Sequence, residues 1–144
     1  MERIRKRWLF KSLVATVLIG MLYLLFTGDE FLLKPTMGVV AFPIGTLLSW
    51  LLLILFSVLC YPLKKDEKSI FRHLSSIALV NALLWGIISY GLAGNWFFRF
   101  NNSVEGFRGS TAAFDWFLRY TGFTLLFPIL VLFVILVFRL FNNK

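Results

Sequence analysis

The chain alternates between four long apolar runs and short polar segments. The apolar runs cover residues 8-26, 37-63, 74-98 and 120-138. Each run has the length of a helix that crosses the roughly 30 Å hydrocarbon core of a bilayer. The pattern therefore predicts an all-α integral membrane protein, in which residues 1-144 form a single membrane domain, a four-transmembrane-helix bundle.

The first apolar run lies where a secretory signal peptide would be expected. It extends from Trp8 to Phe26, which is longer than the apolar region of about 7–15 residues in a signal peptide. We therefore expect a transmembrane helix here, with Lys11 reaching back to the membrane interface.

The composition agrees with a membrane protein. Hydrophobic residues make up 59% of the chain and charged residues 15%, whereas soluble domains contain about 45–50% apolar and about 25% charged residues. The net charge of +8 would favour nucleic acid in a soluble protein. Here the basic residues flank the apolar runs, as orientation signals do, so no nucleic-acid partner is expected.

The basic residues predict the orientation, because cytoplasmic loops of membrane proteins are enriched in Lys and Arg. With the N-terminus inside, the cytoplasmic side would carry Arg3, Arg5, Lys6, Arg7, Lys11, Lys64, Lys65, Lys68, Arg72, Arg139 and Lys144. The outer side would carry Lys34, Arg99, Arg108 and Arg119. We therefore expect a multi-pass protein of the cytoplasmic (inner) membrane with both termini cytoplasmic.

Small residues recur at every fourth position in three of the four runs. They are Ser12, Thr16 and Gly20 in the first run, Ala41, Gly45 and Ser49 in the second, and Ala78, Ala82 and Gly86 in the third. Small residues let membrane helices approach closely, and burial of apolar surface gives helices no driving force to associate in lipid. We therefore expect the first three helices to form the packed core and the fourth to cover one side of it. The pattern leaves open whether these contacts lie within one chain or between two.

Asn81 places an amide near the middle of the third run. One interpretation is a hydrogen bond between helices that sets how they pack, since such bonds average about 0.6 kcal/mol in membrane bundles. The other is a position that lines a conduction path or a binding pocket.

The segment 99-119 mixes aromatic and charged residues, which suits a chain lying at the headgroup region of the membrane. Its charged residues are Arg99, Glu105, Arg108, Asp115 and Arg119. The arginines are suited to contact phosphate or carboxylate groups of a lipid or a partner protein, because a guanidinium binds such groups with two hydrogen bonds. Alternatively, they anchor the segment at the interface and pair with its own acidic residues.

The sequence does not assemble a catalytic centre or a metal site. The chain has one His and one Cys, too few for the Cys and His ligands of a zinc site. No charged residue lies in the middle of an apolar run, where ion-coupled transporters usually carry one, so a proton-driven antiporter is not expected, although a passive pore is not excluded. No nucleophile, base and orienting acid can be assembled from the sequence either. We therefore expect no enzyme activity, no catalytic residue, no cofactor and no metal.

The leading hypothesis is a non-catalytic membrane protein that acts through protein contacts, as an accessory subunit, an assembly factor or an immunity-type protein. Its partners would be the lipid bilayer and either another membrane protein or a second copy of the chain. The alternative hypothesis is a small oligomeric channel, or a lipid or solute permease, with Asn81 and the small-residue stripes lining its path.

Overall fold

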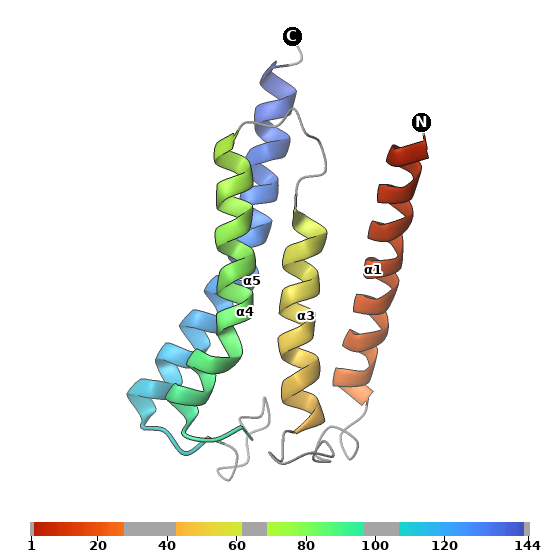
Figure 1. The fold of residues 1–144 in the computed structure, drawn as a ribbon. Coiled ribbons are helices and arrows are strands. Elements are labelled where there is room, and N and C mark those ends of the chain that lie inside the picture. Colours follow the sequence, from red (N-terminus) through yellow and green to blue (C-terminus); the bar gives the residue numbers. More distant parts are fainter. Residues whose placement is uncertain (1, 28–42, 62–68, 97–106, 143–144) are drawn as a thin grey trace.

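The computed structural model describes residues 2–27, 43–61, 69–96 and 107–142. Within these residues it contains four helices, which confirms the all-helical prediction. They are α1 (Glu2–Thr27), α3 (Ile44–Cys60), α4 (Ser69–Ala93) and α5 (Thr111–Asn142). Consecutive helices run in opposite directions, so the start of α1 and the end of α5 lie at the same end of the bundle (Figure 1).

Three of these helices are long and apolar enough to cross a membrane. Their spans are Trp8–Thr27 in α1, Ser69–Ala93 in α4 and Thr111–Phe141 in α5. The remaining helix, α3, is apolar but has 17 residues in the described part of the chain.

The ends of α3 follow from prolines on both sides. Pro43 is the N-cap residue in an extended conformation, and its carbonyl accepts a hydrogen bond of 3.2 Å from the backbone N–H of Leu47. Tyr61 is extended because the residue before a proline disfavours the helical conformation. The helix therefore covers Ile44–Cys60 rather than 37-63, and residues 37–42 and 62–63 lie outside the described residues.

Helix α4 begins and ends earlier than the predicted 74-98. It starts at Ser69 and ends at Ala93. Gly94 follows in the left-handed conformation with φ 73°, and its N–H donates to the carbonyl of Tyr90 at 2.8 Å. A glycine in this conformation commonly terminates helices because it lacks a Cβ.

Helix α5 starts at Thr111, well before the predicted Tyr120, so residues 111–119 of the predicted interfacial segment 99-119 are helical. Ser110 caps the start, because its hydroxyl accepts a hydrogen bond of 3.2 Å from the N–H of Ala113. Phe117, which is 3% exposed, gives this first part of α5 a buried side. Capping and one-sided burial explain why charged residues within the segment do not interrupt the helix.

In every described helix, buried positions follow one another at steps of three, four or seven residues. They are Val14, Leu18 and Met21 in α1; Thr46, Leu53, Ser57 and Cys60 in α3; Phe71, Ser75, Ala78, Ala82, Trp85, Ser89 and Ala93 in α4, where Gly86 is buried beside this line; and Phe117, Thr124, Pro128, Val131 and Ile135 in α5. This heptad-like spacing keeps the buried positions in one line along a helix and is typical of bundles whose helices cross at about 20°. We call each such line a seam.

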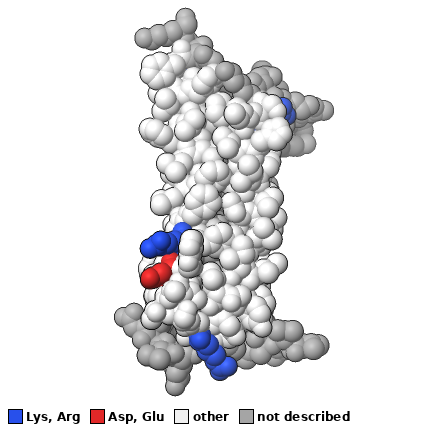
Figure 2. Space-filling model, turned by 90° about the vertical axis from the view of Figure 1, so that its left-hand side faces the viewer, with Lys and Arg blue, Asp and Glu red and all other residues white. Residues whose placement is uncertain are grey.

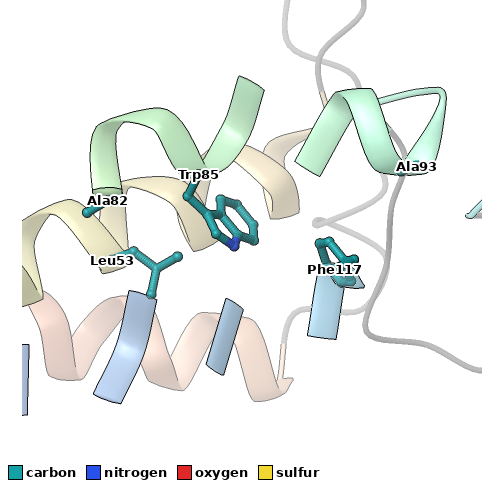
Figure 3. Close-up of a cluster of buried hydrophobic side chains, with 5 residues drawn as sticks. All are labelled: Leu53, Ala82, Trp85, Ala93 and Phe117. Carbon is teal, nitrogen blue, oxygen red and sulfur yellow. The ribbon is translucent and has the colours of Figure 1, made fainter. Parts of the chain in front are cut away.

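The packed core consists of α3, α4 and α5, not of the first three helices as predicted. Helix α3 contacts the three other described helices, whereas α1 contacts α3 alone among them. One core cluster joins Leu53, Ala82, Trp85, Ala93 and Phe117, and Figure 3 shows the Trp85 indole between Leu53 and Phe117. The prediction was wrong because it took small residues as the measure of packing, whereas α5 packs through large side chains and α1 lies at the edge.

Candidate interaction site

The closest approach between α3 and α4 is built from Trp50 and Gly86. The Trp50 indole lies directly on Gly86, where an added Cβ would overlap the ring. The indole Nε1 donates to the carbonyls of Ala82 at 2.9 Å and Leu83 at 3.1 Å. Together with Ala78, which is 2% exposed, these residues place the third predicted stripe inside the bundle.

Other polar side chains join the ends of the core helices. Trp85 donates from Nε1 to Thr121 Oγ1 at 2.9 Å, which links α4 to α5. Thr46 donates to the backbone carbonyl of Trp96 at 2.7 Å, which links the start of α3 to the residues after α4. The Trp96 ring in turn stacks on Tyr90 with centroids 4.4 Å apart. Sequence reasoning missed these links because each joins residues far apart in the chain.

Asn81 is half-buried on α4, and its interhelical bond involves the backbone. Its carbonyl accepts a hydrogen bond of 3.2 Å from the Tyr120 hydroxyl on α5. The side-chain amide forms no hydrogen bond with any part of the chain that the structure describes. Its proposed roles, in packing or in lining a path, stay predictions.

The predicted stripe on α3 lies beside the seam. Gly45 and Ser49 are half-buried, and the Ser49 hydroxyl donates to the carbonyl of Gly45 at 2.8 Å. Ala41 lies outside the described residues. This stripe therefore borders the contact with the neighbouring helices without forming its centre.

The predicted stripe on α1 points away from the bundle. Ser12, Thr16 and Gly20 are exposed, whereas the buried seam of α1 lies nearly opposite them on the helix. The Thr16 hydroxyl donates to the Ser12 carbonyl of its own helix at 3.0 Å. Within 4 Å of a Cβ built on Gly20 there is no other described atom. The three residues therefore form an open, small-residue face, which we call the α1 outer face.

Lys11 ties α1 to the end of α3. Its Nζ donates to the carbonyls of Leu59 at 2.6 Å and Tyr61 at 3.1 Å. The last carbonyls of a helix lack partners within it and carry partial negative charge, so a cation there is stabilising. The sequence predicts that Lys11 reaches toward a membrane interface, but it offers no signal for these acceptors.

The charged residues near the start of α5 are exposed. Arg108, Asp115 and Arg119 lie at the surface, whereas Arg99 and Glu105 lie outside the described residues. Figure 2 shows an acidic and a basic side chain next to each other on a face that is otherwise largely uncharged. The Arg119 guanidinium carbon lies 5.9 Å from the centre of the Trp116 ring. In the described part of the chain no ion pair joins Asp115 to Arg119.

Three seam hydroxyls are buried without a hydrogen-bond partner among the described residues. They belong to Ser57 on α3 and to Ser75 and Ser89 on α4. Each is at most 4% exposed. Because serine is small, these positions let the helices approach closely, but a buried hydroxyl without a partner costs stability.

The described residues contain no group of three or more His, Cys, Asp or Glu side chains that could hold a metal ion. What the structure does display is an open α1 outer face and an exposed charged face on α5. Comparison of the chain with protein-family models, with curated proteins and with solved structures gave no match.

Proposed function

We propose that this chain is a four-span protein of a cytoplasmic membrane, with both termini in the cytoplasm, that acts without catalysis by binding another membrane protein. The proposal has two parts, the arrangement in the membrane and the surface that binds the partner.

The position of α3 supports a fourth span. Its 17 residues extend about 26 Å, close to the thickness of the hydrocarbon core. It lies alongside α1, α4 and α5, each of which is long enough to cross (Figure 1). Its apolar sequence and its contacts with these helices are the reasons why we propose that α3 also crosses the membrane.

The arrangement of chain ends and charges supports the orientation. The start of α1 and the end of α5 share one end of the bundle, and these two segments carry the basic residues Arg3, Arg5, Lys6, Arg7 and Arg139. The test is labelling of Ser110→Cys with a membrane-impermeant thiol reagent in intact cells, since the native Cys60 is buried. Labelling from outside is expected, and labelling only after the cytoplasm is opened would overturn the orientation.

The α1 outer face carries the proposal of partner binding. In the most apolar part of each span, buried residues make up 17% in α1, compared with 22% in α5 and 33% in α4. Like Gly91 and Gly122, Gly20 meets no other described atom where a Cβ would lie, but it alone of the three continues a line of small residues, Ser12 and Thr16. In membrane proteins, small residues at this spacing are enriched where helices meet. We infer that a helix of another membrane protein packs on Ser12, Thr16 and Gly20.

A pair of bulky substitutions tests this inference. Gly20→Leu adds a side chain into open space, so the bundle should fold as before while a bound partner is blocked. Gly91→Leu is the matched control, because a Cβ at Gly91 also meets no described atom within 4 Å. We expect Gly20→Leu alone to reduce co-purification of the partner in mild detergent. The partner would be identified by cross-links from a Thr16→Cys variant.

Two results would contradict the proposal. Equal recovery of the partner with Gly20→Leu and Gly91→Leu would show that the α1 outer face is not the binding surface. A specific flux of ions, lipids or small solutes through the protein reconstituted alone in liposomes would favour the channel or permease hypothesis instead.

A further inference from the structure

The start of α5 carries two opposite charges on one exposed face. Asp115 and Arg119 are four residues apart and both are exposed, so they lie about one helical turn from each other on the same side. Trp116 lies next to them and is 62% exposed. Asp115 is closer to the start of α5, and Arg119 is closer to the middle of the bundle.

The charges along α5 indicate the depth of this face. Between Arg119 and Arg139 the helix has no charged residue, and this stretch extends about 30 Å, the thickness of the hydrocarbon core. Arg119 therefore lies near one boundary of the core and Asp115 one turn beyond it, in the headgroup region. An exposed tryptophan such as Trp116 is typical of that boundary.

The side of α5 opposite these charges is packed against the rest of the bundle. Phe117 is 3% exposed and packs against Trp85, with ring centroids 6.2 Å apart. The Phe107 ring packs on the same side, with its centroid 5.6 Å from that of Phe117 and 5.2 Å from that of Phe114. The two exposed charged residues therefore belong to a helix whose opposite side is packed against α4.

The Arg119 guanidinium lies over the Trp116 ring, 5.9 Å from its centre. A guanidinium in this position keeps its N–H groups available at its edge, where phosphate is bound with two hydrogen bonds. The Asp115 carboxylate, one turn away, repels a second anionic group but accepts hydrogen bonds from an ammonium group. The two side chains form no ion pair with each other within the described part of the chain.

We propose that Asp115, Trp116 and Arg119 bind the headgroup of a phospholipid that carries a primary amine, with the phosphate on Arg119 and the ammonium on Asp115. The short link between phosphate and ammonium in such a headgroup suits charges one helical turn apart. A choline headgroup lacks the N–H donors for Asp115, and a glycerol headgroup lacks the positive charge. The inference rests on the proposed span of α5.

Lipid retention measured by native mass spectrometry tests this site. The purified protein would be mixed in detergent with phosphatidylethanolamine, phosphatidylcholine or phosphatidylglycerol of identical acyl chains. We expect phosphatidylethanolamine to be retained about two- to tenfold more than phosphatidylcholine, the range of one net hydrogen bond. Asp115→Asn should remove this preference, and Arg119→Gln should lower retention of all three lipids.

Arg72→Gln serves as the control, because Arg72 is also an exposed arginine but lies near the start of α4, at the other end of the bundle. It should leave the lipid preference unchanged. Equal retention of the three lipids by the wild-type protein, a preference for phosphatidylglycerol, or an unchanged preference in Asp115→Asn would each overturn the proposal. Retention of lipid by the purified protein in detergent does not depend on its orientation in a membrane or on a partner protein. A negative result in this experiment is therefore distinguishable from failure of the proposed function.

Discussion

Substitution of Gly86 by alanine tests the α3–α4 contact most directly. Within a helix, replacing glycine by alanine ordinarily stabilises by about 0.5–1 kcal/mol. At Gly86 the new Cβ would overlap the Trp50 ring, and overpacking of this kind typically costs about 1–3 kcal/mol. Displacing the ring also weakens the hydrogen bond from Nε1 to the carbonyls of Ala82 and Leu83, worth about 0.6 kcal/mol in membrane bundles. The net expectation is a loss of about 0.6–3 kcal/mol.

The measurement is reversible unfolding in mixed micelles, with sodium dodecyl sulfate as the denaturant and tryptophan fluorescence as the signal. Gly122→Ala is the matched control, since Gly122 lies inside α5 and a Cβ there meets no described atom within 4 Å. It should stabilise the protein by up to about 1 kcal/mol. The free energy of unfolding should therefore fall in Gly86→Ala and rise in Gly122→Ala. This difference separates a specific clash from the general effect of alanine in a helix.

The reasoning also predicts coupling with Trp50. If the clash lies with the indole, then Gly86→Ala should cost much less in a Trp50→Leu background, because the smaller side chain leaves room for the Cβ. Residues in contact commonly show coupling of about 0.5–3 kcal/mol in such cycles. Equal stability of Gly86→Ala and Gly122→Ala, or additive effects of the Gly86 and Trp50 substitutions, would refute the packing described here.

Two further substitutions test other parts of the bundle. Lys11→Met should release α1 from the end of α3, because it removes charge-assisted hydrogen bonds to the carbonyls of Leu59 and Tyr61, which are worth about 1.5–3 kcal/mol. Faster amide hydrogen exchange in α1, with unchanged exchange in α4 and α5, would confirm this expectation. The same change of exchange rate in all described helices would contradict it. Ser57→Ala should raise stability by about 1 kcal/mol, since the buried hydroxyl has no partner among the described residues; a lower unfolding midpoint than wild type would show that the hydroxyl is hydrogen-bonded.

The helices themselves could be predicted from the apolar runs, but their ends depend on local chemistry that the runs do not show. Gly94 ends α4 inside an apolar stretch through its backbone conformation. Ser110 starts α5 inside a charged stretch through its capping hydroxyl. In both cases a single residue outweighs the hydropathy of its neighbours, because the exposed backbone groups at a helix end need partners whatever side chains surround them.

The predicted stripes show why the arrangement of the helices was harder to predict. Residues at every fourth position shift by about 40° around the helix axis at each step, so a long stripe of this kind winds around the helix. Residues at alternating steps of three and four stay near one line along the helix. On α4 the two patterns coincide, because Ala78 and Ala82 belong to the seam and Gly86 follows the seam residue Trp85. On α1 the stripe shares no position with the seam.

This difference bears on how each stripe is used. A stripe that coincides with the seam of its own helix is accounted for by packing inside the chain, as Gly86 is by Trp50. A stripe that avoids the seam, as Ser12, Thr16 and Gly20 do, lines up small residues at positions where the described chain does not pack against them. Contact with a helix from outside the chain gives such residues a role, which is why the proposed partner binding rests on α1 and not on α4.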